Sequence, residues 1–430
     1  MKKNTKIVAT IGPASESKEK LREMAEAGMN VVRLNFSHGE YEWHETVINR
    51  VREVSEELKR PIAILADIQG PRIRTKVEAP FRVAKGDAVF VGDISAETEF
   101  PKTRGHWFFL DQPNIVHDIG VDDLILVEDG LLQFRVMKKE GNVLELEAIN
   151  DGEVKNRKGV NLPDSKLRLP VITEKDARDI RFVVGHGVDY VGLSFVGNAE
   201  DIRSARTLMA GEGIAESALP KIVAKIERKE AIKNLNEIVH EADAVMVARG
   251  DLGIELPETR VAILQKEIIA ASLSAVRPVI VATQMMKSMT ENPRPTRAEV
   301  SDVTNAVIDH ADAVMLSEES AMGKYPVETI RTMSEIIANT EESPFDNVYQ
   351  TIGMNLRSEY ATMVRSVYEL AKSYDAEIIL LVSESGFTAR LMSHFRPDSR
   401  LFVATNNQRA WNRMALFWGV DATLFADNTQ

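Results

Sequence analysis

Three charged side chains at the ends of two apolar runs are the strongest chemical signal in the sequence. Lys225 and Glu227 end one run of β-forming residues, and Asp251 follows a second run at 244–248. Because side chains alternate along a strand, Lys225 and Glu227 point the same way. Helix-type sequence between the runs predicts a βαβ unit, and parallel folds bind ligands at their strand ends. A lysine beside two carboxylates there suits an oxyanion-stabilising charge next to a divalent-metal site.

A second group of polar side chains ends the run at 30–36. Arg33, Asn35 and Ser37 occupy alternate positions and so share one face of a strand. The arginine offers a forked donor for a phosphate, and the two neutral side chains offer oxygens to a monovalent cation. A solvated strand end with a turn is the alternative interpretation of this segment.

Three further strand ends carry groups that suit an anionic ligand. Asp67 precedes a Gly-Pro turn and two arginines, Arg72 and Arg74, although an ordinary hinge would look the same. Gly250 lies in a Gly-Asp-Leu-Gly sequence, where a tight turn would point backbone N–H groups at a carboxylate or phosphate. Glycines that serve turn geometry alone are the alternative. Thr283 ends another apolar run with a hydroxyl.

The elements that must position these groups predict a (β/α)8 barrel. Eight β-forming runs alternate with helix-type segments, which is the strand count of that fold. The runs are 6–11, 30–36, 62–68, 190–196, 221–226, 244–248, 278–283 and 313–317. After the third run, short strands and turns replace the helical periodicity, which predicts an all-β insertion.

We therefore expect three domains. The barrel takes residues 1–74 and 163–341, the all-β lid 75–162, and a small α/β domain 342–430. A chain of 430 residues is too long for one compact core, in line with this division.

Composition excludes several classes of protein. A net charge of −12 argues against binding of nucleic acid or of an anionic membrane, both of which need a basic surface. The absence of cysteine excludes disulfides, thiolate chemistry and cysteine-ligated zinc. No apolar run reaches the length of a transmembrane helix or of a signal peptide, so we expect a cytoplasmic protein.

Taken together, these segments resemble the pyruvate kinase family. The match extends from Thr5 to about Val420. Its most specific segments are 33–39, 67–74, 157–163, 225–227, 248–253 and 293–302. The resemblance implies a Mg²⁺-dependent transfer of the phosphoryl group of phosphoenolpyruvate to ADP, which gives pyruvate and ATP in the last step of glycolysis.

The resemblance also implies roles for the charged groups. Glu227 and Asp251 would hold the catalytic Mg²⁺ or Mn²⁺, and Lys225 would neutralise charge on the phosphoryl group and on the enolate oxygen. Arg33 would clamp the phosphoryl group, and the N–H groups of Gly250 and Asp251 would take the substrate carboxylate.

By the same resemblance, Thr283 belongs to the path that protonates the enolate, and Ser317 extends it. The nucleotide-side positions are Thr10, Pro13, Asn35, His38, Arg74 and Lys158. Lys158 lies where the lid returns to the barrel, so closure of the lid would bring it onto the phosphates and exclude water.

Arg72 departs from the glutamate that many members of the family carry, and those members need K⁺. The K⁺ ligands would be Asn35, Ser37, Asp67 and the carbonyl of Ile68. A fixed guanidinium at Arg72 supplies a positive charge in its place, so we expect K⁺ to be dispensable.

Three other departures bear on turnover and regulation. Glu318 replaces a usual glycine near the proton path, where it either slows turnover or points to solvent, and Asp164 replaces a common glycine at a probable hinge. The C-terminal domain lacks about two strands, as in a truncation or a short natural form. Ser383, Ser385 and Thr388 resemble the loop that binds an effector phosphate, with a plain glycine turn as the alternative.

Two other classes of function remain as alternatives. One is a catalytically weak paralogue that serves as a binding or regulatory protein. The other is a different Mg²⁺-dependent barrel enzyme acting on phosphoenolpyruvate or a 2-oxo acid, such as an aldolase or mutase, which would not need the nucleotide-side residues. Family habit implies a homotetramer, which the loss of C-terminal strands could reduce to a dimer.

Overall fold

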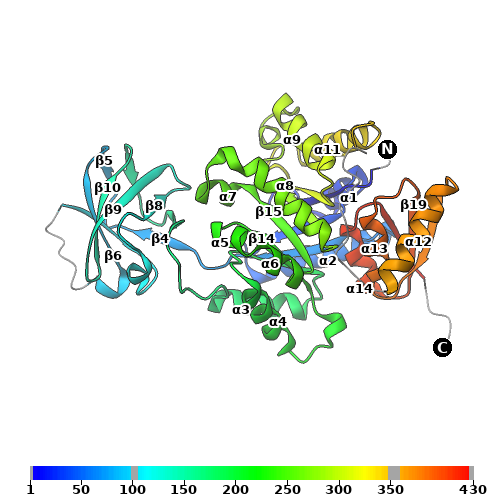
Figure 1. Ribbon diagram of the computed structural model, residues 1–430, viewed down its shortest axis with the longest axis horizontal. Helices are drawn as coiled ribbons and strands as arrows, with labels where there is room; N and C mark the ends of the chain where they lie inside the picture. Colours follow the sequence, from blue (N-terminus) through cyan, green and yellow to red (C-terminus); the bar gives the residue numbers. More distant parts are fainter. Residues whose placement is uncertain (1–2, 98–104, 347–358, 426–430) are drawn as a thin grey trace.

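The computed structural model describes residues 3–97, 105–346 and 359–425. The chain forms an elongated molecule with three parts in a row (Figure 1). An all-β lid lies at one end, a barrel in the middle and a small α/β domain at the other end.

Eight parallel strands close the central barrel, in the order β1-β2-β3-β13-β14-β15-β16-β17. They are β1 (Lys6–Thr10), β2 (Val31–Asn35), β3 (Ala63–Ile68), β13 (Tyr190–Leu193), β14 (Lys221–Ile226), β15 (Ala244–Ala248), β16 (Val279–Ala282) and β17 (Ala313–Leu316). The predicted barrel is confirmed. Most of the strands end one to three residues before the predicted limits, because the chain there turns out of the sheet into the loops that carry the polar groups.

Helices cover the outside of the barrel. They are α1 (Lys18–Ala27), α2 (Tyr41–Leu58), α3 (Glu174–Gly185), α4 (Ala199–Ala210), α5 (Lys229–Lys233), α6 (Leu235–Glu241), α7 (Arg249–Glu255), α8 (Glu258–Ser274), α9 (Arg297–Ile308), α10 (Glu318–Ala321) and α11 (Pro326–Glu341). Capping boxes at Thr173, Asn198 and Thr296 fix where three of them begin. Every residue of β1, β3 and β15 is buried, as expected for strands covered on both faces.

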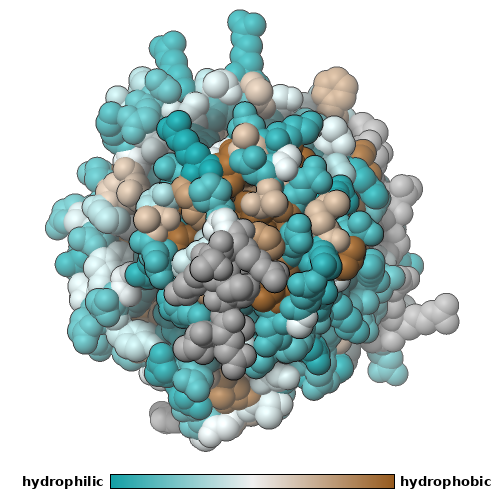
Figure 2. Space-filling model, turned by 90° about the vertical axis from the view of Figure 1, so that its left-hand side faces the viewer, coloured by the Kyte–Doolittle hydropathy of each residue, from teal (hydrophilic) through white to brown (hydrophobic). Residues whose placement is uncertain are grey.

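The lid lies between β3 and α3 and has its own core around Phe108 and Phe134. Its strands are β4 (Ile73–Lys76), β5 (Phe81–Val83), β6 (Ala88–Asp93), β7 (His106–Leu110), β8 (Leu124–Val127), β9 (Leu132–Glu140), β10 (Val143–Ala148), β11 (Gly152–Val154) and β12 (Gly159–Asn161). Seven of them close a second barrel, and β5 pairs with β11. Hydrophilic residues cover most of the face seen from the lid end (Figure 2).

The C-terminal domain packs against the amino-terminal ends of the barrel strands. It contains α12 (Glu359–Ser373), β18 (Ile378–Val382), α13 (Phe387–His394), β19 (Arg400–Thr405), α14 (Gln408–Arg413) and β20 (Val420–Leu424), with a parallel sheet in the order β18-β19-β20. Leu391 and Met414 belong to the same apolar cluster as Tyr190 and Met246 of the barrel. The lid and this domain therefore occupy opposite ends of the barrel (Figure 1).

Candidate active site

Four charged side chains interlock inside the carboxyl end of the barrel. Lys225 Nζ lies 3.0 Å from Asp67 Oδ1 and 2.8 Å from Glu227 Oε1, and it donates to Ser194 Oγ at 2.7 Å. On the other side of Asp67, the Oδ2 oxygen accepts from Arg33 Nε at 2.7 Å, and a second Arg33 nitrogen lies 2.6 Å away. Strands β2, β3, β13 and β14 thus bring the groups together.

Burial and neighbouring charges act against each other on the protonation of this cluster. It favours the neutral amine of Lys225, but Asp67 and Glu227 outweigh it and raise the pKa of the lysine above its ordinary value. Burial also opposes ionisation of Asp67, yet Lys225 and Arg33 hold the pKa of that carboxyl below its ordinary value. For Glu227, burial raises the pKa, Lys225 offsets this only in part, and the charge of Asp251 adds to it.

Glu227 presents an oxygen that suits a cation. Its Oε2 accepts the N–H of Phe195 at 2.8 Å, and Phe195 adopts a φ of 58°. Its buried Oε1 accepts no hydrogen bond of good geometry, although Lys225 Nζ is close. Within residues 3–97, 105–346 and 359–425 no cluster of three or more histidine or carboxylate groups is suited to a metal. The two carboxylates Glu227 and Asp251 fit a hard divalent cation that keeps waters and takes substrate oxygens.

The segment after β15 is helical, so the prediction of a tight glycine turn at Gly250 was wrong. Helix α7 begins at Arg249, and the N–H of Gly250 donates to Thr283 Oγ1 at 2.8 Å. Thr283 and Gln284 have φ angles of 70° and 54°, a strained conformation typical of functional sites. Asp251 lies in the first turn of α7, where the helix dipole favours its negative charge.

Arg249 is a site residue to which the sequence analysis gave no role. Its guanidinium donates to the carbonyl of Thr283 and to Asp302 Oδ1, both at 2.7 Å. These contacts hold the strained end of β16 in place. The only signal in the sequence was an arginine directly before Gly250, and its partner Asp302 is 53 residues away.

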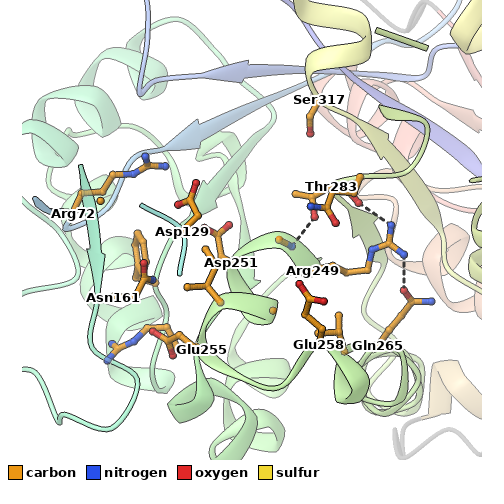
Figure 3. A pocket seen from close by; sticks show the side chains of 18 of the residues that line it. Arg72, Asp129, Asn161, Arg249, Asp251, Glu255, Glu258, Gln265, Thr283 and Ser317 are labelled. Carbon is orange, nitrogen blue, oxygen red and sulfur yellow. Dashed lines mark hydrogen bonds between the residues drawn. The ribbon is translucent and has the colours of Figure 1, made fainter. Parts of the chain in front are cut away.

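A cavity of about 980 Å³ lies between the lid and the carboxyl end of the barrel. Four predicted site residues, Gly250, Asp251, Thr283 and Ser317, line it. Figure 3 shows Arg72, Asp129 and Asn161 facing Asp251, Arg249 and Thr283 across this space. Lys225, Glu227 and Arg33 do not line the cavity. The first two lie behind Phe195, which lines it and contacts Glu227.

Comparisons with known proteins agree with this arrangement. Two family models match, "Pyruvate kinase, barrel domain" over residues 2–330 and "Pyruvate kinase, alpha/beta domain" over residues 361–430. The chain belongs to the pyruvate kinase family. The prediction of the family is thereby confirmed, and the alternative of an aldolase or mutase is wrong.

Relatives within the pyruvate kinase family cover almost the whole chain. A pyruvate kinase of Geobacillus stearothermophilus is 42% identical over 98% of this chain and 71% of its own length, and one of Agaricus bisporus is 39% identical over 97% and 79%. The crystal structure of a pyruvate kinase from Cryptosporidium parvum aligns with a TM-score of 0.92 at 31% identity, covering 98% of this chain and 87% of that one. No helix in the described part of the chain is long and apolar enough to span a membrane.

The nucleotide-side positions predicted from the pyruvate kinase family lie outside the cavity lining. They are Thr10, Pro13, Asn35, His38, Arg74 and Lys158. Thr10 Oγ1 accepts from Arg33 at 2.9 Å and donates to the carbonyl of Leu316. Lys158 Nζ lies 2.6 Å from Glu128 Oε1, so the structure pairs this lysine within the lid.

Three of the four predicted monovalent-cation ligands already have partners. Asp67 binds Arg33 and Lys225, and the carbonyl of Ile68 accepts from Ser194 Oγ at 2.7 Å. Asn35 Oδ1 accepts the N–H of Ser37 at 3.1 Å. Arg72 lines the cavity instead (Figure 3).

The other departures from the pyruvate kinase pattern lie at the surface. Glu318 lines the cavity, 63% exposed and 3.8 Å from Lys287. Asp164 pairs with Lys229 at 3.0 Å, which ties the returning lid segment to the barrel.

In the predicted effector loop, the hydroxyls of Ser383 and Ser385 form hydrogen bonds within the turn before α13. Ser383 Oγ accepts the N–H of Gly386, and Ser385 Oγ accepts that of Phe387. Gly386 has a φ of 81°, and Thr388 is already in the helix. These contacts satisfy local backbone groups.

Proposed function

We propose that this protein transfers the phosphoryl group of phosphoenolpyruvate to ADP, giving pyruvate and ATP. Supporting this, the ion-paired cluster of Arg33, Asp67, Lys225 and Glu227 lies behind a cavity that Asp251 and Thr283 line. In the reaction the bond between phosphorus and the enol oxygen breaks, a bond to a β-phosphate oxygen of ADP forms, and the enolate carbon takes a proton.

Lys225 stabilises the negative charge that develops on the enolate oxygen and on the phosphoryl group. Its amine stays charged because Asp67 and Glu227 raise its pKa. A charge fixed before the reaction needs no reorganisation during it, which makes such groups effective. Arg33 contributes a second charge, and its contacts with Asp67 and Thr10 hold it in one orientation.

Glu227 and Asp251 would hold Mg²⁺ or Mn²⁺, which when bound would supply positive charge to the phosphoryl and carboxylate oxygens of the substrate. The raised pKa of Glu227 supports this assignment, because burial and the charge of Asp251 disfavour its ionised form unless a further cation is present. The N–H groups of Gly250 and Asp251 bind the substrate carboxylate, which requires Gly250 to release the hydroxyl of Thr283.

Thr283 delivers the proton to the enolate carbon, and Ser317 connects this hydroxyl with solvent in the cavity. The Thr283 hydroxyl donates to the carbonyl of Ala282 at 2.6 Å, so it must turn away from that carbonyl to deliver the proton. Exchange of the Gly250 N–H for substrate would leave its oxygen free to turn. On the nucleotide side, Lys158 leaves Glu128 when the lid closes on the phosphates of ADP.

The remaining assignments are also proposals. The barrel takes residues 1–74 and 163–341, the lid 75–162 and the C-terminal domain 342–430, except that lid strand β4 already begins at Ile73. The protein works in the cytoplasm as a homo-oligomer, and K⁺ is dispensable because Arg72 supplies a cation at the cavity. Ser383, Ser385 and Thr388 bind an effector phosphate, which requires the two serine hydroxyls to release the backbone N–H groups of the turn.

One assay tests the proposal. ATP and pyruvate formation from phosphoenolpyruvate, ADP and MgCl₂ is measured in parallel with K⁺ and with Na⁺. Equal, brisk rates in both salts support the activity and the role of Arg72, and a rate with K⁺ alone supports the activity but not that role. Absence of turnover in both salts would overturn the activity and favour the non-catalytic binding protein.

A further inference from the structure

Five cationic side chains gather where the C-terminal domain meets the amino-terminal end of the barrel. Lys221 begins β14, Arg277 directly precedes Pro278 and β16, and Arg206 lies on α4. Arg390 and Arg413 come from α13 and α14, the helices that face the barrel in Figure 1. We call these residues the basal cluster. They interact electrostatically with one another or with Asp243, which precedes β15.

Backbone carbonyls and one carboxylate hold three members of the basal cluster in place. Arg413 donates to the carbonyls of Leu219 at 2.6 Å and Ser217 at 3.3 Å. Arg277 donates to the carbonyl of His240 at 2.8 Å. Arg206 donates to Asp243 Oδ2 at 3.2 Å. The cluster is therefore a fixed arrangement rather than a set of free surface side chains.

Negative charge in the basal cluster falls well short of the positive charge. Asp243 forms ion pairs with both Arg206, at 3.2 Å, and Lys221, at 3.8 Å. Glu241, a second carboxylate near the cluster, lies 3.9 Å from Arg206 and pairs with Arg203 at 3.2 Å. Buried Asp189, next to Lys221, pairs with Arg52 at 2.8 Å. Five cations thus face little more than one carboxylate, in a chain whose net charge is −12.

Unused hydrogen-bond donors point to a missing partner. The Nε atoms of Arg277, Arg390 and Arg413 are buried and have no acceptor in the described chain. Arg413 is only 8% exposed. No hydrogen bond or ion pair within the described residues holds the guanidinium of Arg390, which stacks over the Phe387 ring at 5.6 Å.

This arrangement disfavours the ionised form of two of its arginines, and their pKa values are lowered as a result. Burial, followed by the charge of Arg390, lowers the pKa of Arg277 to about 10, and burial lowers the pKa of Arg390. Buried cations without partners are strongly destabilising, and proteins normally pair them or bind an ion beside them.

We propose that the basal cluster binds a phosphate group, which bridges the barrel and the C-terminal domain. Arginine forks match the tetrahedral oxygens of phosphate with paired donors, and this site draws arginines from both domains. The phosphate is either the free inorganic ion or part of a phosphorylated metabolite. The site uses none of the residues proposed for catalysis and none of the hydroxyls of the effector loop, so it stands independently of the proposed function.

The test compares thermal unfolding of the full chain in sodium chloride and in sodium phosphate at equal ionic strength. For the unchanged protein, saturating phosphate raises Tm by about 2 to 4 °C, because an anion that binds only the folded state stabilises it. Arg390→Gln removes a buried cation that lacks a partner. This variant is therefore at least as stable as the parent in chloride and loses the phosphate response.

Matched variants separate this site from other anion sites. Arg82→Gln makes the same chemical change on an exposed lid strand and keeps the full response. Ser385→Ala isolates the effector loop and also keeps it, whereas Arg277→Gln, on the barrel side, loses it as Arg390→Gln does. Glucose 6-phosphate in place of inorganic phosphate distinguishes the sources: a larger shift at equal concentration identifies a metabolite site, and an equal or smaller shift identifies an inorganic phosphate site.

Two results would overturn the proposal. A phosphate response that survives in both Arg390→Gln and Arg277→Gln would place the anion elsewhere, such as in the active-site cavity. An equal loss of Tm in chloride and in phosphate for both variants would show that the arginines serve packing alone.

Discussion

The two ends of the barrel differ in how far their positive and negative side chains balance one another. At the carboxyl ends of the strands, Arg33 and Lys225 interleave with Asp67 and Glu227 at 2.6 to 3.0 Å. At the amino ends, the five cations of the basal cluster share Asp243 and part of Glu241. The first end balances its charges, and its carboxylates Glu227 and Asp251 suit a cation. The second end has an excess of cations with unsatisfied arginine nitrogens, beside one unsatisfied oxygen of Asp189, and is suited to an anion. The comparison indicates that the local balance of charge, rather than the net charge of the chain, decides which ligand an end of the barrel suits.

The largest effect is expected when Lys225 is removed from the ion-paired cluster at the carboxyl end of the barrel. Lys225→Met leaves Asp67 and Glu227 without their shared cation, which costs about 3–5 kcal/mol of stability. It also removes the charge beside the enolate oxygen, so we expect kcat to fall about 10³-fold. Steady-state kinetics and urea unfolding measure the two effects. Lys233→Met, on the exposed side of α5, is the control and should change neither. Retention of kcat within tenfold would remove Lys225 from the proposed chemistry.

The sequence pattern predicted this cluster only in part. Alternation along β14 placed Lys225 and Glu227 on one face, and the strand count predicted the barrel that holds them. The contact between Lys225 and Asp67 was not predicted, because it spans β13 between β3 and β14. Gly192 lies beside Asp67 in that register and has no side chain to separate them.

Contacts between distant segments explain the other differences. The turn expected at Gly250 is a helix, and Thr283, 33 residues further on, binds its N–H. The residues around Gly250 give no indication that Thr283 will be its partner. The basal cluster was missed for the same reason, since its five members come from four elements and one loop in two parts of the chain and form no motif.

Glu227 should control metal binding, with an effect smaller than that of Lys225. Glu227→Gln is expected to raise the Mg²⁺ concentration needed for half-maximal activity about 10- to 100-fold, because a hard anionic ligand is lost. Glu267→Gln, on an exposed position of α8, is the matched control. An unchanged Mg²⁺ requirement in a folded Glu227→Gln protein would place the metal elsewhere.

The raised pKa of Glu227 gives this end of the barrel a pH signature. The folded state favours the protonated carboxyl, so without metal this group's contribution to stability is lost as pH rises from the ordinary glutamate pKa through the raised one. A divalent cation binds the ionised form and reverses the loss. We therefore expect the Tm increase caused by Mg²⁺ to grow with pH over that window, as scanning calorimetry would show. An increase independent of pH would contradict the assignment.

Arg72 tests whether a fixed guanidinium substitutes for a monovalent cation. Arg72→Glu places a carboxylate at the cavity wall, so we expect the rate in Na⁺ to fall about tenfold and K⁺ to restore most of it. Arg82→Glu makes the same change on an exposed lid strand outside the cavity lining and should leave the ratio of the two rates unchanged. If Arg72→Glu showed the same ratio as the unchanged protein, the guanidinium would not be the reason for K⁺ independence.

The pair between Glu128 and Lys158 should give the smallest effect, because both side chains are partly exposed. Exposed pairs are worth about 0.2–1 kcal/mol, so Glu128→Gln should lower the KM for ADP by no more than about fivefold as Lys158 becomes free to meet the phosphates. The pair is also screened by salt, so the advantage of the variant should shrink as ionic strength rises. Glu153→Gln alters a weaker pair with Lys155 in the same lid and controls for net charge. A KM that rises in Glu128→Gln would mean that this carboxylate orients Lys158 for the nucleotide instead of withholding it.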